Sequence, residues 1–120
     1  MELSQSQVTT LLASLESEPV EAVWLYGSYA NGSAHAGSDL DVALQLASGV
    51  DEWSFLAGVN SELSARLGLQ VNAININSAP TPLALEAVEG RRLWASSHAL
   101  AMLTEQGIWG KWQEWQENRK

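Results

Sequence analysis

The spacing of hydrophobic residues predicts four helices along the chain. Apolar residues recur every three or four positions in the longer segments, and Pro82 and Gly90 bound a shorter one. Two glycines, Gly107 and Gly110, fall inside the last segment and should weaken its middle. The predicted helices cover residues 4–17, 51–67, 82–88 and about 97–118.

Short apolar or alternating runs predict three strands, at residues 21–26, 39–46 and 70–76. The second of these alternates cleanly, because successive side chains of a strand point to opposite faces. One face carries Leu40, Val42, Leu44 and Leu46, and the other carries Asp39, Asp41, Ala43 and Gln45. The segment between the first two strands, residues 27–38, is small and polar, which is typical of a loop or a short helical turn.

The order helix, strand, strand, helix, strand, helices predicts an α/β (α+β) protein with a small mixed sheet and helices packed on it. With 120 residues, the chain fits one domain, residues 1–120, and leaves no room for a second core. Residues 97–120 form a C-terminal helical segment that is a candidate for partner binding. Trp109, Trp112 and Trp115 recur there at spacings of three, which fits either docking onto the core or a partner surface.

The net charge of −8 argues against direct binding to DNA or RNA, whose phosphates an acidic surface repels. A single nucleotide is not excluded, because a divalent metal can bridge acidic side chains to phosphates. The chain contains no cysteine, so it has neither disulfides nor a thiolate metal site. The acidic N-terminal segment does not resemble a signal peptide, and no apolar run is long enough for a membrane span. We therefore expect a cytoplasmic protein.

Asp39 and Asp41 are the candidate metal ligands. They lie two residues apart on the alternating strand, so both carboxylates project from one face, roughly 6.5–7 Å apart at Cα. Two like charges at this spacing are unfavourable without a cation. Oxygen ligands favour Mg²⁺, which takes one or two carboxylates together with substrate phosphates.

Gly27 and Ser28 follow the first strand and open the glycine-rich segment. Backbone N–H groups at such a turn can bind a phosphate, and the Ser28 hydroxyl can donate a hydrogen bond to a phosphate oxygen. Gly27 allows the backbone to approach the ligand closely.

Gly27-Ser28, ten intervening residues and then Asp39-Leu40-Asp41 resemble the signature of the polymerase-β-like nucleotidyltransferases. The fuller pattern, GSYANG, five residues and SDLDVAL, is similar to the minimal branch (MNT), often found as the antitoxin partner of HEPN-type RNase toxins. LQVNAININSAP and LEAVEGRRLW follow in the family's order, so the resemblance covers roughly residues 20–95. A lone pair of aspartates would be weak, whereas this spacing before an alternating strand is specific.

The resemblance implies that Asp39 and Asp41 bind one or two Mg²⁺ ions and that Gly27, Ser28 and Ser38 hold the nucleotide. It also implies a reaction, the transfer of AMP from ATP to a tyrosine of the HEPN-type toxin, with which the chain would form a hetero-oligomer. Catalysis would rest on positioning and charge neutralisation.

The sequence departs from the family pattern at Asn72. The family places a third carboxylate on the next strand, where this chain reads Val71-Asn72-Ala73. An amide can offer a carbonyl oxygen to a metal but brings no charge and cannot act as a base. Either the chain is a variant of low or no activity, or an aspartate has been replaced here. Asn31 is a second departure, because the family often has an arginine at that position.

Three functions remain open at this point. The first is the Mg²⁺-dependent transferase acting on a partner protein, and the second is an antitoxin that neutralises its partner by binding alone. The third, a transferase for a small acceptor such as an aminoglycoside, is disfavoured because so short a chain has no recognisable acceptor domain. Outside the motif, His35 is expected to be a solvated loop residue, and Arg91 and Arg92 to be exposed in a short connector.

Overall fold

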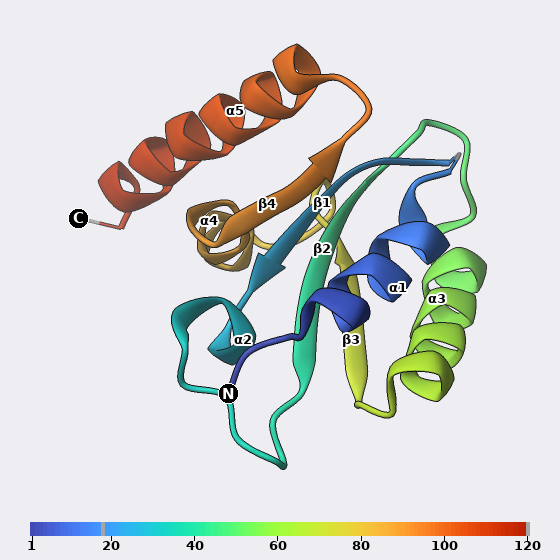
Figure 1. Ribbon diagram of the computed structural model, residues 1–120. Coiled ribbons are helices and arrows are strands. Elements are labelled where there is room, and N and C mark those ends of the chain that lie inside the picture. The colour runs from blue at the N-terminus through green and yellow to red at the C-terminus, as the bar shows by residue number, and fades with distance from the viewer. Residues whose placement is uncertain (18, 120) are drawn as a thin grey trace.

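A computed structural model describes residues 1–17 and 19–119 of the chain (Figure 1). Helices and strands alternate over these residues in an order that extends the predicted one. The elements are α1 (Gln5–Leu15), β1 (Val20–Tyr26), α2 (Ser28–Asn31), β2 (Leu40–Leu46), α3 (Glu52–Leu67), β3 (Val71–Asn75), α4 (Thr81–Glu89), β4 (Arg91–Ala95) and α5 (His98–Glu117). Lys120, the last residue of the predicted C-terminal segment, lies outside the described residues.

The strands form one mixed sheet in the order β3-β2-β1-β4. β1 runs antiparallel to both β2 and β4, whereas β2 and β3 are parallel and are joined by the crossover through α3. The prediction of a small mixed sheet is therefore confirmed. Because β2 lies between β1 and β3, the strand that carries the candidate acidic residues is internal to the sheet.

β4 is a strand that the sequence analysis did not predict. Arg91 and Arg92, expected in an exposed connector, instead begin this edge strand, which pairs with β1. Its five residues are mostly half-buried and show no apolar alternation. Pairing with β1, and not an amphipathic pattern of its own, therefore defines β4.

Helices cover both faces of the sheet (Figure 1). α1 and α3 pack on the face that carries Val23, Leu25 and the aliphatic side of β2. α4 and α5 pack on the opposite face, around Trp24, Tyr26 and Ala43. Most of β2 is consequently buried on both sides, and Asp41, near its first residue, lies where the cover of the second face ends.

The free edge of β3 is capped by side chains of α3. The backbone N–H of Val71 donates to Ser64 Oγ at 3.0 Å, and that of Ala73 donates to Asn60 Oδ1 at 2.8 Å. Unpaired strand edges invite pairing with other chains, and these two side chains occupy donors that would otherwise be available. The edge next to Asn72 is thereby held in place.

The ends of α1 and α3 are stabilised by capping residues. Ser4 forms a capping box with Gln7 at the start of α1. Asp51 caps α3, which ends at Gly68 in the left-handed conformation (φ 68°). α5, in contrast, continues unbroken through Gly107 and Gly110, because packing stabilises the helix despite two residues of low helical propensity.

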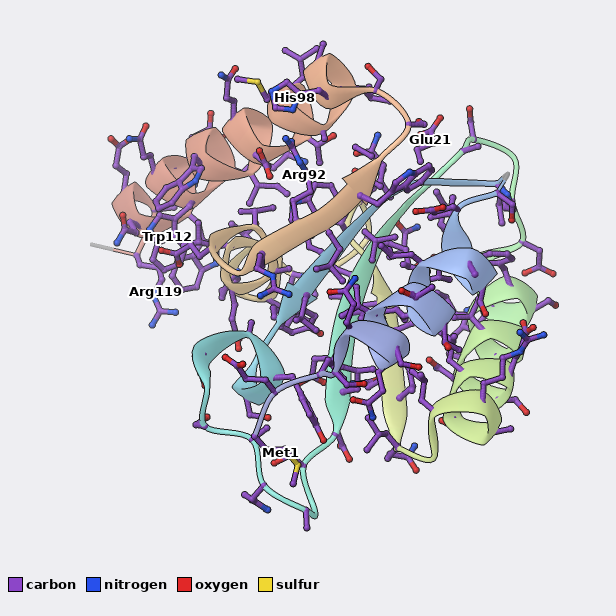
Figure 2. All side chains as sticks on the ribbon, in the orientation of Figure 1. Met1, Glu21, Arg92, His98, Trp112 and Arg119 are labelled. Carbon is purple, nitrogen blue, oxygen red and sulfur yellow. The ribbon has the colours of Figure 1, made fainter. Side chains whose placement is uncertain are left out.

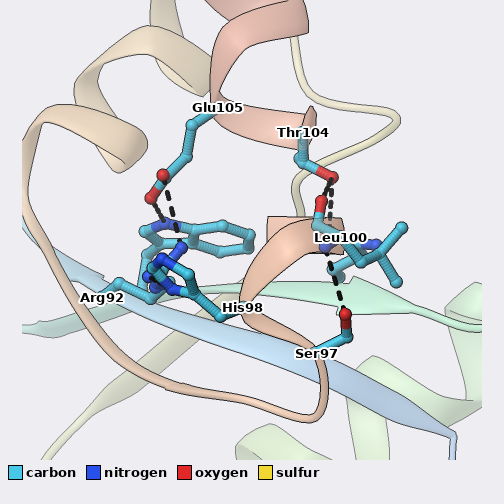
Figure 3. Close-up of polar contacts among 8 residues, drawn as sticks. Arg92, Ser97, His98, Leu100, Thr104 and Glu105 are labelled. Carbon is cyan, nitrogen blue, oxygen red and sulfur yellow. Dashed lines mark hydrogen bonds and ion pairs between the residues drawn. The ribbon is translucent and has the colours of Figure 1, made fainter. Parts of the chain in front are cut away.

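α5 is held against the sheet by apolar contacts and by a set of polar contacts. Ala101 and Ile108 are buried against the sheet face. Figure 3 shows the polar contacts, in which Glu105 lies over Arg92 with an N–O distance of 3.4 Å. Arg92 also contacts His98 at the start of the helix (Figure 2). His98 is the first residue of α5.

Trp112 and Trp115 face inward or along the helix instead of forming one exposed patch with Trp109. Their rings stack at a centroid distance of 5.0 Å, and the Arg119 guanidinium lies 4.5 Å from the Trp115 centroid. Trp112 packs against the core cluster beneath α5, whereas Trp109 is 44% exposed. Docking onto the core is thus confirmed for Trp112, whereas a partner surface stays a prediction.

Candidate functional site

Asp41 lies where three strands meet side by side. In the sheet register it is opposite Tyr26 of β1 and opposite Asn72 of β3. Asp39 lies inside the predicted strand, 39–46, but one position before the first residue of β2 in the structure, and it is exposed. The pairing of β2 with β3 therefore places position 72 beside Asp41, as the order of the motif implied.

The glycine of the turn and the aspartate of the strand are in close contact. Gly27 has a φ of 73°, and a Cβ built on it would lie 2.5 Å from Asp41 Oδ2. Any side chain at this position would displace the carboxylate, and an L-residue would also be strained at this φ. Gly27 is thus required for two reasons at the point where β1 passes into α2.

Ser28 is the first residue of α2, and it is half-buried. The N–H groups of Ala30 and Asn31 both donate to the Gly27 carbonyl, at 3.0 and 3.1 Å. The N–H groups at the start of a helix have no intrahelical acceptor, so those of Ser28 and Tyr29 can serve a ligand. Ser28 thus follows Gly27, whose backbone lies close to the Asp41 carboxylate.

Ser38 closes its own loop. Its hydroxyl accepts a hydrogen bond from the His35 N–H at 2.8 Å, and its own N–H donates to the His35 carbonyl at 2.9 Å. The His35 ring turns back on the same loop, where Nδ1 accepts from the Gly37 N–H at 3.2 Å. Both residues order the approach to Asp39, and His35 is exposed as expected.

The electrostatics around Asp41 favour a cation. Burial raises the pKa of Asp41 above its ordinary value of 3.8, the hydrogen bond from Asn72 opposes this, and the charges of Asp39 and Glu86 add to the rise. The pKa of Tyr26 is raised to about 12 by its burial and by the neighbouring charges of Asp41 and Glu86. The site thus brings the negative charges of Asp39 and Glu86 close to Asp41.

Asn72 contacts Asp41 directly. Its Nδ2 donates to Asp41 Oδ1 at 3.5 Å, a long and weak hydrogen bond. The side chain is otherwise exposed, so its carbonyl oxygen is accessible from solvent. An aspartate at this position would face Asp41 with a like charge, which would sharpen the requirement for a cation.

Glu86 of α4 is the residue that sequence reasoning missed. It acts electrostatically on both Asp41 and Tyr26, and it lines a hollow of about 350 Å³ beside the turn. The other lining residues are Gly27, Ala30, Asn31, Glu89, Gly90 and Arg91. Glu86 belongs to no motif. Its place beside Asp41 follows only from the way α4 packs on the sheet after β3.

A second and larger hollow, of about 550 Å³, lies away from the acidic residues. It opens between α3, β3 and the segment before α4, and Trp53, Leu56, Ile74 and Leu83 are among the apolar residues that line it. None of the residues predicted for the nucleotide site contributes to it. The larger hollow and the predicted nucleotide site are therefore separate.

The donor set around Asp41 fits Mg²⁺ chemically. Carboxylate oxygens of Asp39 and Asp41 and the amide oxygen of Asn72 are the hard ligands that this ion prefers. Within residues 1–17 and 19–119, no group of three histidine, aspartate or glutamate side chains converges to hold a metal.

Comparison with protein families decides the affiliation of the chain. Residues 9–99 match the model of the family described as polymerase beta, nucleotidyltransferase. The chain belongs to the polymerase β nucleotidyltransferase family. The match includes every strand of the sheet and all six predicted site residues, and it ends at the second residue of α5.

The chain is also similar to one related protein and to two solved structures. It is 30% identical over 81 residues to the protein adenylyltransferase MntA of Shewanella oneidensis, a match that covers 64% of this chain and 55% of that protein. The chain thus spans about half the length of this relative.

The fold is similar to that of a toxin–antitoxin structure with AMP-PNP, with a TM-score of 0.82 and 24% identity over 98% of this chain and 93% of that one. A complex of tri-AMPylated Shewanella oneidensis HEPN toxin with MNT antitoxin is also similar, with a TM-score of 0.81 and 21% identity over 98% and 92% of the two chains. At these identities the likeness establishes the nucleotidyltransferase fold. Among the described residues, no helix combines the length and apolar character needed to cross a membrane.

Proposed function

We propose that this chain is an antitoxin that transfers AMP from ATP to a tyrosine of a HEPN-type toxin, with Mg²⁺ as its cofactor. One observation carries the proposal: the Asp41 carboxylate touches Gly27 on one side and Asn72 on the other. The acidic strand, the turn that would hold the phosphates and the position of the third carboxylate are therefore joined at one point. The similarity to MntA supports the choice of AMP and of a protein acceptor.

In this proposal Asp39 and Asp41 hold one or two Mg²⁺ ions, and Gly27, Ser28 and Ser38 bind the nucleotide. When bound, Mg²⁺ would neutralise the negative charge of the triphosphate. The N–H groups at the start of α2 and the Ser28 hydroxyl orient the phosphates. The proposal places the reaction in the cytoplasm, where ATP is available.

The transfer forms one bond and breaks one. The tyrosine oxygen of the toxin attacks the α-phosphorus of ATP, the bond from that phosphorus to the bridging oxygen breaks, and pyrophosphate leaves with the electron pair. The hydroxyl proton passes to water, because Asn72 cannot accept it. A missing general base costs roughly 10²–10⁴-fold in rate, so we expect transfer by this chain to be slow.

A second candidate is favoured by the same residue. With Asn72 in place of a carboxylate, the alternative function is that of a binding module, which neutralises its toxin by complex formation and retains only the fold of the transferase. The two functions differ in one observable. Transfer requires Asp39 and Asp41, whereas neutralisation by binding survives their replacement.

The test incubates a HEPN-type toxin with the chain, ATP and Mg²⁺ and then measures the mass of the toxin by intact-protein mass spectrometry. We expect slow addition of AMP by the unaltered chain, faster addition by Asn72→Asp, and none by Asp39→Asn or Asp41→Asn. Toxin activity is assayed in parallel. If the unaltered chain and Asn72→Asp both leave the toxin unmodified yet inactive, the binding module is the correct function.

A further inference from the structure

The outward face of α5 is apolar over three turns. Leu100, Met102, Leu103 and Trp109 are 37%, 40%, 65% and 44% exposed, and they are most of the large hydrophobic residues that the described surface presents. Between Ala99 and Gly110, none of the exposed residues carries a charge. Glu105 is the one charged residue in this stretch, and it points inward to Trp24 and Arg92. A solvated face of a helix normally carries charges, so this face has the composition of an interface.

Two glycines lie on the same face without an internal reason. A Cβ built at Gly107 or Gly110 would meet nothing within 4 Å, and neither glycine has a positive φ. Each costs the helix stability relative to alanine, and neither the packing nor the backbone of this chain requires it. Because glycine has no side chain, both positions allow another helix to pack closely, with its axis about 8–10 Å away.

α5 also stands outside the catalytic family match. The nucleotidyltransferase model ends at residue 99, so nearly all of α5 lies beyond it. The toxin–antitoxin structures, in contrast, align over 98% of this chain, and that coverage must include most of α5. The helix is therefore not part of the shared transferase core, although it belongs to the form of the fold that those structures have.

The charges identify the occupant. The chain carries a net charge of −8, and the exposed Lys111, Glu114 and Glu117 follow the apolar stretch toward the C-terminal end of α5, two acidic residues against one basic. Two copies of this chain would bring together like charges, whereas a basic partner is attracted. The HEPN-type toxin of the proposed function is an RNase, and a protein that binds RNA needs basic residues.

We infer that the outward face of α5, from Ala99 to Gly110 with Glu114 and Glu117 at its end, binds a helix of the HEPN-type toxin. The inference rests on the proposed function for the identity of the partner but not for the reaction. Leu103 and Trp109 fill the apolar centre, the glycines allow close approach of the partner helix, and the two glutamates face its basic residues. Trp112 and Trp115 belong to the docking of α5 and lie outside this surface.

The test measures the affinity for the toxin without ATP, by calorimetry, together with the melting temperature of each variant. We expect Leu103→Asp and Trp109→Ala to weaken binding by at least about 10-fold. Trp53→Ala is the matched control, because Trp53 is 87% exposed on α3, across the sheet from α5. If Trp109→Ala and Leu103→Asp bind as tightly as the unaltered chain, or if Trp53→Ala weakens binding equally, the inference is wrong.

The glycines give a test with opposite signs. Gly107→Ala and Gly110→Ala together should raise the melting temperature by about 3–8 °C while weakening binding to the toxin. Gly58→Ala, in the middle of α3 with nothing within 4 Å of its Cβ, should raise the melting temperature without changing affinity. Loss of binding cannot then be ascribed to misfolding. A gain in stability with unchanged affinity would overturn the role of the glycines as an interface.

The outcomes separate this inference from the proposed function. Binding that depends on α5 without any transfer of AMP rejects the enzymatic proposal and supports the surface. Transfer of AMP, together with unchanged affinity in all α5 variants, supports the enzymatic proposal and rejects the surface. A toxin that does not bind overturns the surface, and so does a self-associated chain that Leu103→Asp converts to a monomer in light scattering.

Discussion

The indole nitrogen of Trp24, in the middle of the sheet, donates a hydrogen bond to Glu105 Oε2 of α5 at 2.8 Å. Trp24 is fully buried, and Glu105 also pairs with Arg92 of β4. One carboxylate therefore joins a central strand, an edge strand and the last helix. A residue 81 positions away along the chain satisfies the only polar group of a large core side chain.

Glu105→Ala should destabilise the protein, because the buried Trp24 N–H would lose its acceptor. An unsatisfied buried donor costs about 1–3 kcal/mol, and the free energy of unfolding in urea should fall by that amount. Glu114→Ala, on the exposed side of the same helix, is the control and should change it by less than about 0.5 kcal/mol. Equal effects of the two substitutions would show that the hydrogen bond contributes nothing measurable.

Gly90→Ala should also destabilise the fold, although Gly90 has an ordinary negative φ of −74°. A Cβ there would overlap the carbonyl oxygen of Leu25 and approach Tyr26 Cα to 3.1 Å, so the α4–β4 junction would have to move away from β1. Overpacking of this kind costs about 1–3 kcal/mol, measurable as a lower midpoint in urea. A substitution without effect would mean that the junction yields freely.

Much of the fold could be predicted from local patterns. The alternation of β2 has a local physical cause, because successive side chains of a strand point to opposite faces, and it was predicted correctly. β4 could not be predicted, because its half-buried residues show no alternation and its stability comes from pairing with β1. The inward and outward division of the tryptophans likewise depends on how α5 docks, which no periodicity of the helix reveals.

The candidate site divides in the same way. Gly27, Asp39, Asp41 and Asn72 could be named from the motif, and the register of β2 with β3 brings position 72 beside Asp41. Their roles remain proposals. Glu86 could not be named, because its proximity depends on how α4 returns across the sheet after β3. A residue outside any motif can be assigned to a site only when the topology of the fold is known, so it cannot be predicted from the sequence alone.

Gly27→Ala should impair AMP transfer more than it impairs stability. The new Cβ would lie 2.5 Å from Asp41 Oδ2 and displace that carboxylate, and the φ of 73° adds strain of roughly 1–2 kcal/mol. Misplacement of a ligand by about 1 Å costs on the order of 10²-fold in rate. Transfer is measured by intact-protein mass spectrometry, with the more active Asn72→Asp chain as the background.

Gly32→Ala is the matched control for this position. Gly32 ends α2 with a similar φ of 83°, yet a Cβ there would meet nothing within 4 Å. It should lower the unfolding free energy by a similar strain and leave the rate of transfer unchanged. If both alanines slow transfer equally, backbone strain in the turn, and not contact with Asp41, is responsible.

Asp41→Asn should stabilise the metal-free protein at neutral pH. Burial, together with the charges of Asp39 and Glu86, raises the pKa of Asp41 above 3.8 in the folded state. The folded protein then binds this proton more tightly than the unfolded chain, so stability falls as the pH rises from 3.8 through the raised pKa. The difference between Asp41→Asn and the unaltered chain should be greatest at pH 7 and should shrink as the pH falls toward 3.8. Urea unfolding across this range measures it.

Mg²⁺ with a non-hydrolysable ATP analogue should reverse that order at pH 7. A ligand bound only by the folded state raises the melting temperature, and by this proposal only the unaltered chain retains both carboxylates that hold the ion. The unaltered chain should therefore gain stability on addition of Mg²⁺ and the analogue, whereas Asp41→Asn should gain little. An equal gain in both proteins would show that the ion binds elsewhere. If Asp41→Asn instead makes the metal-free protein less stable, the carboxylate stabilises the fold. The cluster of negative charge would then give no support for a cation site at Asp41.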